Sequence, residues 1–479
     1  MGWASVVGAV ALATLGIIVG CRSAPARAQL LVIVDTDAPL VGQLSERPEL
    51  SPDSAVDTLR VDILDTKNAT VDQQRFVVPE AAGTWPISFG VRAEPGTEVR
   101  FRIRLFRGLF GRVSTQNGMA TVEPPSQVTI ERLAYVRLPR DGVLRVGLFL
   151  HEDCLGVPSS FLEPATTCID GAQLAGVPSD GIDMLADATV PATRAGSWTP
   201  ALETRCLGDD PARVCIPGGF SIIGEPSLVG YASGGDFDPI PLRPIVLSPF
   251  RLDKYEYTVS RFRSLVSSGR FTSELPFLKK PNDPVNKFCT WVGLSDSSDD
   301  TLPINCVTWA TAKAVCELEG GSLPTEAQWE HAARGRGQRR RYPWGDTSAN
   351  CCTASLSRVG ERPEVAYCSS GTGVEPVGSH LANTACPGLG DLSRDGVADL
   401  GGSLNELMAD SYEPYDAACW QSPGILHDPQ CNTISGNGHA SRGSNWNAGL
   451  DTPLGASRSG YAGPSSVWGF RCKYPAALP

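Results

Sequence analysis

Cysteine is the residue type that most constrains how this chain of 479 residues can fold, because fifteen of its residues are cysteines. So many cysteines in a long chain indicate an oxidising compartment, where disulfides hold distant segments together. Disulfides use cysteines in pairs, and an odd number leaves one thiol to be explained. The N-terminal segment supplies the explanation.

Residues 1–28 predict an export signal. The stretch 6–20 is uncharged and almost wholly apolar, and it suits the apolar region of a signal peptide better than a membrane span, which needs about 20 residues. It ends at Cys21 in a sequence that resembles the bacterial lipobox, in which the cysteine is lipidated and becomes the new N-terminus. A competing A-x-A site for ordinary signal peptidase lies at 26–28. We expect an exported bacterial protein, either a periplasmic or outer-membrane lipoprotein or a secreted protein, and without Cys21 fourteen cysteines remain.

Charge and composition narrow the partners of the chain. Lys and Arg number 41 against 52 Asp and Glu, which gives a net charge of −11. This balance argues against nucleic acid as a partner, and it leaves the N-terminal lipid as the only expected contact with a membrane. An apolar content of 42% is ample for buried cores, while 50 glycines and 38 prolines predict many turns, short strands and few long helices.

Residues 29–150 predict an all-β domain. The run 99–106 alternates arginine with apolar residues, which is typical of a strand with one face in water. Several such runs separated by glycine and proline turns predict an antiparallel, immunoglobulin-like sandwich. His151 follows the last run without a nearby ligand partner, and we expect it to be a surface residue. The expected strands are 30–35, 59–64, 76–78, 87–92, 99–106, 128–138 and 143–150.

Residues 151–205 are rich in proline, serine and threonine and are expected to form a linker, held together locally by a disulfide between Cys154 and Cys168. The rest of the chain, 206–476, is aromatic, glycine-rich and cysteine-rich. Helices are expected at 258–269 and 308–319, and a third helix begins at 325 with a threonine and a glutamine in capping-box spacing.

Residues 320–335, GGSLPTEAQWEHAARG, resemble the signature G-x-R-L-P-T-E-A-E-W-E-x-A-A-R-G of the formylglycine-generating enzyme, or sulfatase-modifying factor, family. The resemblance implies an irregular α+β fold related to C-type lectins, placed after the all-β domain. Further family motifs occur in the family's order: IPGGF at 216–220, KYEYT at 254–258, VTW at 307–309, YPWG at 342–345, PVGS at 376–379, DLGGS at 399–403, RGSNW at 442–446 and GFRC at 469–472.

The same resemblance implies a disulfide between Cys316, in the helix before the LPTE motif, and Cys472 of the closing GFRC. Closing so long a loop stabilises a fold by roughly 4–5 kcal/mol in the chain-entropy model. Cys206 with Cys215, and Cys351 or Cys352 with Cys368, are further candidate pairs, although connectivity cannot be read from one sequence.

The chemistry of the family depends on cysteines that this chain lacks. Family enzymes use two cysteines in C-x4-C spacing after the RGGS motif to bind copper and the substrate thiol, and soft thiolates are what Cu(I) requires. The corresponding positions fall near Ala448 and Pro453, and no cysteine occurs between Cys431 and Cys472. We therefore predict that the protein binds no copper and generates no formylglycine. The five histidines also lack the H-x3-H-x-E pattern of the family's non-heme-iron branch, and His331 is expected to be a surface or packing residue.

Calcium is the cofactor that the sequence favours. Residues 391–399 have oxygen side chains at four positions of an EF-type loop and a glycine at the sixth, but a glycine replaces the usual glutamate at position twelve. The family's calcium sites map onto Asn350 with the Cys351 carbonyl, and onto Ser403 with Glu406. The candidate loop ligands are Asp391, Ser393, Asp395 and Asp399.

One strong basic run, with arginines at 334, 336, 339, 340 and 341, lies between the LPTE helix and YPWG and is expected to be a solvated loop rather than a site for an acidic partner. The sequence thus favours an exported, non-catalytic binding or structural protein for an unidentified protein or glycan ligand. The alternative is an oxidoreductase of the family, of the formylglycine-generating or iron-associated type, with an altered active site.

Overall fold

The computed structural model of the chain describes residues 29–77, 85–116, 119–171, 173–177, 195–228, 239–359, 368, 371–381, 390–421, 423–433 and 438–476. The predicted export signal, with Cys21, lies outside these residues. Within the described ranges, every helix is too short or too polar to span a bilayer.

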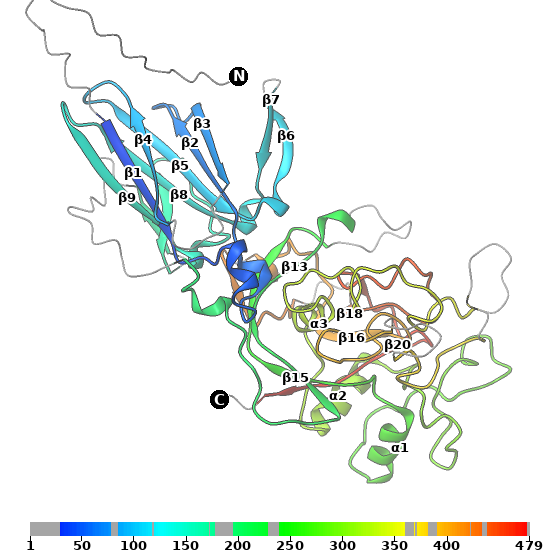
Figure 1. Ribbon diagram of the computed structural model, residues 1–479. Helices are drawn as coiled ribbons and strands as arrows, with labels where there is room; N and C mark the ends of the chain where they lie inside the picture. The colour runs from blue at the N-terminus through cyan, green and yellow to red at the C-terminus, as the bar shows by residue number, and fades with distance from the viewer. Residues whose placement is uncertain are drawn as a thin grey trace, which may run out of the picture.

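Two β-sheets face each other in the N-terminal domain (Figure 1). Their inner faces bury leucine, valine and phenylalanine side chains in one apolar core. One sheet has the order β4 (Ile87–Arg92), β1 (Gln29–Thr36), β9 (Val143–Leu150), and the other has the order β3 (Thr70–Val77), β2 (Thr58–Leu64), β5 (Glu98–Phe106), β8 (Thr129–Arg137).

Each predicted strand overlaps an observed one, but the prediction of a wholly antiparallel sandwich was wrong. Strand β1 pairs with β9 in parallel and with β4 in antiparallel orientation. Segments that pair in parallel need a long connection, and the partner of β1 lies more than a hundred residues away, so no local pattern reports it. The prediction also missed the hairpin of β6 (Arg112–Gln116) and β7 (Met119–Glu123).

The arginine face of β5 is covered over part of its length, contrary to the expectation of a wet face. Arg104 is 3% exposed and forms ion pairs with Asp62 on β2 at 2.5 Å and with Glu123 on β7 at 2.8 Å. Asp62 also pairs with Arg60 of its own strand at 2.9 Å. Buried charges need such partners, and the missed hairpin supplies one of them.

The described part of segment 151–205 packs against the sandwich. The predicted disulfide between Cys154 and Cys168 is confirmed, and both cysteines belong to the sandwich core. Trp198 joins the same core. His151 is half-buried with its ring 4.2 Å from that of Phe149. The segment also contains the hairpin of β10 (Thr166–Asp170) and β11 (Gln173–Gly176).

The C-terminal domain combines short helices with small sheets in an α+β arrangement, as expected (Figure 1). All three predicted helices are present: α1 (Val259–Ser267), α2 (Trp309–Leu318) and α3 (Glu326–Ala333). The sheets are β12 (Arg213–Ile216), β15 (Phe250–Asp253), β21 (Lys473–Pro475); β13 (Gly219–Ile223), β14 (Arg243–Leu247), β17 (Leu426–His427); and β19 (Arg458–Gly460), β18 (His439–Arg442), β16 (Asn405–Ser411), β20 (Trp468–Gly469).

Disulfides fix the irregular loops of this domain. The expected pairs Cys206–Cys215 and Cys316–Cys472 are confirmed, and Cys351 rather than Cys352 pairs with Cys368. Sequence reasoning did not propose Cys289–Cys306 and Cys419–Cys431. Cys352 is disulfide-bonded as well, so every cysteine of the described residues is oxidised.

The two domains share one core at their junction, where β13 lies beside the segment that follows β1 (Figure 1). The Ser51 hydroxyl donates a hydrogen bond to the Phe220 carbonyl at 2.6 Å, and the Asp53 carboxylate accepts one from the Ile222 N–H at 2.9 Å. Phe220 and Ile222 are buried in the apolar core of the sandwich. Strand β13 also contacts α3 through Ser221 and His331, so it links the sandwich to the helix that begins at the glutamate of the LPTE motif.

Candidate functional site

Helix α3 forms because its sequence satisfies the free N–H groups of its first turn. The Thr325 hydroxyl accepts from the Gln328 N–H at 3.2 Å, and the Gln328 amide oxygen accepts from the Thr325 N–H at 3.0 Å. This is the predicted capping box. The helix is buried along its whole length, so its polar side chains require partners inside the domain.

Two buried glutamates of α3 hold the arginines of neighbouring elements. Glu326 forms ion pairs with Arg442 on β18 at 2.9 Å and with Arg458 on β19 at 2.5 Å. Glu330, one turn later, pairs with the same Arg442 at 2.9 Å and with Arg334 at 3.1 Å. The pKa of Glu330 is lowered despite its burial, because the guanidinium groups of Arg442 and Arg334 favour the charged form.

The basic run after α3 is not the solvated loop that the sequence predicted. Arg334 is 5% exposed and Arg336 is 7% exposed. Arg336 pairs with Asp395 at 3.0 Å and with Glu203. Arg334 pairs with Glu225, which follows β13. Apart from Glu330, one turn before Arg334, the acidic partners lie far away in sequence, so the basic run alone gave no sign that it would be buried.

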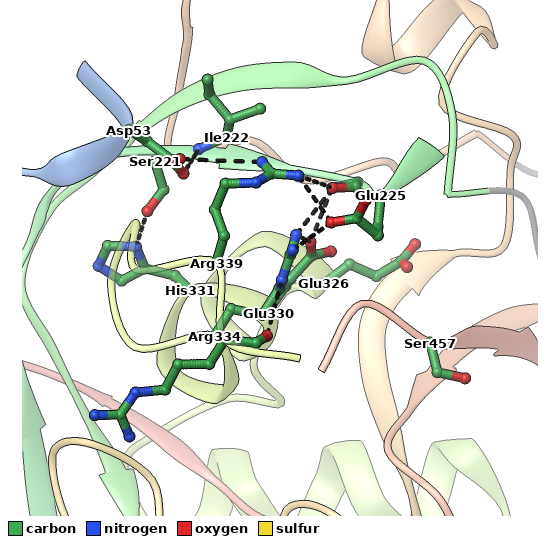
Figure 2. Close-up of polar contacts among 12 residues, drawn as sticks. Asp53, Ser221, Ile222, Glu225, Glu326, Glu330, His331, Arg334, Arg339 and Ser457 are labelled. Carbon is green, nitrogen blue, oxygen red and sulfur yellow. Dashed lines mark hydrogen bonds and ion pairs between the residues drawn. The ribbon is translucent and has the colours of Figure 1, made fainter. Parts of the chain in front are cut away.

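Arg339 joins the two domains. Its guanidinium lies between Asp53 of the N-terminal domain, at 4.0 Å, and Glu225 after β13, at 2.9 Å (Figure 2). Arg334 pairs with the same Glu225 at 2.7 Å. Gly337 in this loop has φ of +77°, and a Cβ there would lie 2.6 Å from Ser51 Oγ, so the close approach of the two domains requires glycine.

A pocket of about 300 Å³ opens beside this loop. Its polar side is made mainly of guanidinium groups, and its apolar side is made of leucine and alanine side chains from two other segments. The lining residues are Glu225, Ser227, Leu228, Arg334, Arg339, Arg340, Arg341, Leu454 and Ala456.

The pocket borders the segment in which the family's enzymes place their thiols. Leu454, which lines the pocket, follows Pro453 directly, and the resemblance to the family places one of the two thiol positions near Pro453. The backbone at the other position, Ala448, accepts hydrogen bonds from the N–H and the hydroxyl of Ser357 at 2.8 and 3.2 Å. Neither position offers a side chain that could bind copper or attack a substrate.

The carboxylates of the predicted calcium loop interact with backbone N–H groups and with an arginine of the protein. Asp391 accepts hydrogen bonds from the N–H groups of Gly401 and Gly402, at 2.8 and 2.9 Å. Asp395 pairs with Arg336. Burial and the nearby charge of Asp399 raise the pKa of Asp391 to about 7. The raised pKa means that the ionised form of Asp391 is destabilised by its surroundings, and a bound cation would stabilise it. In the described structure this carboxylate accepts hydrogen bonds from two backbone N–H groups instead.

The other loop oxygens have donors too. Asp399 accepts the Gly378 N–H at 2.7 Å, and Ser393 Oγ accepts the Val397 N–H at 3.1 Å. Across the described residues, no three acidic, histidine or cysteine side chains converge as metal ligands. These loop oxygens therefore accept hydrogen bonds from the protein's own backbone, and calcium binding at the loop stays a prediction.

Glu406 and Asn350, at the two family-derived calcium positions, already have protein partners, whereas the buried Ser403 hydroxyl has no hydrogen-bond partner in the described structure. The Glu406 carboxylate pairs with Arg471 at 2.6 Å, and Ser403 lies buried three residues earlier in the chain. The Asn350 side-chain oxygen accepts the backbone N–H two residues later, at 2.8 Å. Cys351 is tied into its disulfide. Calcium stays a prediction without support from this geometry.

His331 is a buried packing residue, one of the two roles that the sequence allowed. Its Nε2 lies 3.0 Å from the Pro217 carbonyl and its Nδ1 lies 2.7 Å from the Ser221 hydroxyl (Figure 2). A carbonyl can only accept, so Nε2 carries the proton and Nδ1 accepts from the serine. Burial lowers the pKa of His331 to about 4, and the ring is neutral at physiological pH.

Comparisons with known proteins agree with the motifs. The profile of the "Sulfatase-modifying factor enzyme 1-like domain" family matches residues 199–474. Among curated proteins, the "Inactive C-alpha-formylglycine-generating enzyme 2" of Mus musculus is 26% identical over 43% of this chain and 70% of its own length. The "Formylglycine-generating enzyme" of Streptomyces coelicolor is 31% identical over 28% of this chain, and the match spans half of that enzyme.

Among solved structures, PvdO from Pseudomonas aeruginosa matches 55% of this chain and 93% of its own, with a TM-score of 0.39 and 17% identity. The family profile extends over more than half of the present chain and contains all the ordered motifs, the disulfide to the closing GFRC and the helix α3 described above. The chain therefore belongs to the sulfatase-modifying factor family through its C-terminal domain.

Proposed function

We propose that this protein is an exported, non-catalytic member of the sulfatase-modifying factor family that acts as a binding module. In this proposal the C-terminal domain is a C-type-lectin-like scaffold that presents loops to a protein or glycan ligand. The immunoglobulin-like sandwich serves as a spacer or a second interaction module. The N-terminal segment directs export, and Cys21 is lipidated and anchors the protein in the cell envelope.

One observation carries the proposal: the chain has no thiol where the family's chemistry needs two. No cysteine lies between Cys431 and Cys472, and every cysteine of the described residues is in a disulfide. Copper binding and exchange with a substrate cysteine both require thiolates. The mouse relative, which is named an inactive formylglycine-generating enzyme, supports the proposal because its name indicates that the family includes members without this activity.

Export is supported by the number of disulfides, since such bonds persist in oxidising compartments. To test export and lipidation, the full chain and its Cys21→Ser variant are expressed in a bacterium with labelled palmitate. We expect label and membrane association for the unaltered chain only. Unlabelled protein in the soluble periplasmic fraction would contradict lipidation at Cys21 and indicate cleavage by ordinary signal peptidase.

The test of the non-catalytic role is incubation of the purified protein with a CxPxR peptide, copper and oxygen, followed by mass spectrometry for the aldehyde. An active formylglycine-generating enzyme is the positive control. We expect unchanged peptide and no oxygen consumption. Aldehyde formation above the copper-only control would refute the proposal and favour an oxidoreductase with altered chemistry.

A further inference from the structure

The pocket beside the basic loop has more cationic than anionic side chains. Four guanidinium groups line it, and Glu225 is the one carboxylate among its lining residues. That carboxylate is already shared, because Arg334 and Arg339 both form ion pairs with it, at 2.7 and 2.9 Å. Arg340 and Arg341 bring the guanidinium groups of the lining residues to four, against the one carboxylate of Glu225.

Arg340 shows the imbalance most clearly. Its Nε donates to the Gln338 side chain at 2.9 Å and its Nη1 to the Pro343 carbonyl at 3.3 Å, and both acceptors are neutral. Among the ion pairs of the described residues, none includes Arg340. Partial burial and the positive charges of Arg394 and Arg336 lower the pKa of Arg340, against the opposing effect of Asp395 and Asp346.

Arg339 shows the same excess deeper in the pocket. Its pKa is lowered by burial and by the neighbouring charge of Arg334. Its Nη2 pairs with Glu225 of the pocket lining, while its buried Nη1 is directed at Asp53 of the other domain, 4.0 Å away. The guanidinium groups of Arg334 and Arg339 repel each other, and an anion in the pocket would reduce that repulsion.

The opposite wall is apolar. Leu228, Leu454 and Ala456 are buried and pack together with Tyr342. A volume of about 300 Å³ lies at the lower end of the range for small-molecule sites in proteins, roughly 300–1,000 Å³. The pocket thus combines a cationic wall with an apolar wall, in a space for a compact ligand.

We propose that this pocket binds a small oxyanion, a carboxylate, sulfate or phosphate, whose compact body packs against Leu228, Leu454 and Ala456. The guanidinium groups of Arg340 and Arg341 hold the anion by charge-assisted hydrogen bonds, for which the planar fork of arginine is suited. The inference rests on the proposed binding function and names the chemistry of its ligand.

Isothermal titration of the purified protein tests the pocket with four probes: glucuronate, N-acetylaspartate, inorganic phosphate and glucose. Glucuronate and glucose differ by one carboxylate on the same ring, so their comparison isolates the anion. We expect the anions to bind more weakly as salt increases, and glucose to give no signal. A preference for glucuronate identifies an acidic glycan as the source of the anion, and a preference for N-acetylaspartate identifies an acidic side chain.

Three variants locate the site. Arg340→Gln and Arg341→Gln each remove one guanidinium, and we expect each to weaken binding about tenfold or more. Arg140→Gln is the matched control, because it removes the same charge from an exposed turn of the sandwich, and we expect unchanged affinity. Arg341 is exposed, so its variant separates lost binding from a folding defect.

Two results would contradict anion binding in this pocket. One is no heat from any anion at millimolar concentration, and the other is an equal loss of anion affinity in Arg340→Gln and Arg140→Gln. Either result leaves the non-catalytic role intact if the peptide assay shows no aldehyde. Conversely, aldehyde formation together with arginine-dependent anion binding would refute the non-catalytic role and retain the pocket. The two assays therefore fail separately.

Discussion

At the residue scale, Glu326 is the buried carboxylate that arginines of β18 and β19 share. It is fully buried and pairs with both Arg442 and Arg458. We expect Glu326→Gln to lower the free energy of unfolding by roughly 3–5 kcal/mol, because buried guanidinium groups lose their counter-charge. Urea denaturation measures the change. Glu317→Gln, which breaks an exposed i,i+4 pair with Lys313, is the control, with an expected loss of about 0.5 kcal/mol or less. Equal losses would show that burial of the pair is unimportant.

His331 makes stability depend on pH in a predictable direction. Its folded-state pKa is lowered to about 4, against an ordinary value of 6.5. Below pH 6.5 the unfolded chain binds a proton that the folded chain excludes, so the contribution of this residue falls as pH drops from 6.5 towards 4. Relative to His331→Gln, the unaltered protein should lose about 3 kcal/mol across this window. Denaturation of both proteins at several pH values measures the difference, and parallel pH profiles would contradict the assignment.

The sequence predicted only part of the site at this scale. The arginine run and the LPTE helix were visible as motifs, and the missing thiols near Ala448 and Pro453 followed from alignment with the family motifs. The distant carboxylates that form ion pairs with the buried arginines were not predictable. Asp53 belongs to the other domain, and its pairing with Arg339 exists only because tertiary folding brings the two together.

At the element scale, the capping box of α3 gives a small and specific prediction. Thr325→Ala removes the hydroxyl that accepts the Gln328 N–H, and we expect a loss of about 1 kcal/mol in the free energy of unfolding. Thr325→Ser retains a hydroxyl in the same place and should cost much less. The same loss in both variants would show that the methyl group of the threonine, rather than the cap, is responsible.

The loop 391–399 gives a prediction about metal removal. Its acidic oxygens already accept hydrogen bonds from backbone N–H groups or pair with Arg336, so a calcium ion would have to displace these donors. We expect thermal melting curves in calcium and in EGTA to coincide. A higher melting temperature in calcium, abolished by Asp391→Asn, would restore the loop as a calcium site and show that the loop rearranges to bind the ion.

At the scale of the whole molecule, local patterns predicted the elements better than their arrangement. Alternating and helical periodicities located seven strands and three helices, because these patterns reflect which face of each element is buried. The parallel pairing of β1 with β9 and the shared core of the two domains depend on contacts between distant segments. One sequence carries no direct record of such contacts.

The shared core predicts that the two domains unfold together. Phe220 lies on β13 of the C-terminal domain, is fully buried in the sandwich core and packs edge-on against Trp198 at 5.4 Å. We expect Phe220→Ala to cost about 3–5 kcal/mol and to shift a single calorimetric transition of the whole chain to lower temperature. Phe277→Ala, at a position that is 39% exposed, is the control and should leave the transition nearly unchanged. Two transitions, of which Phe220→Ala moves only one, would show that the domains fold independently despite the core they share.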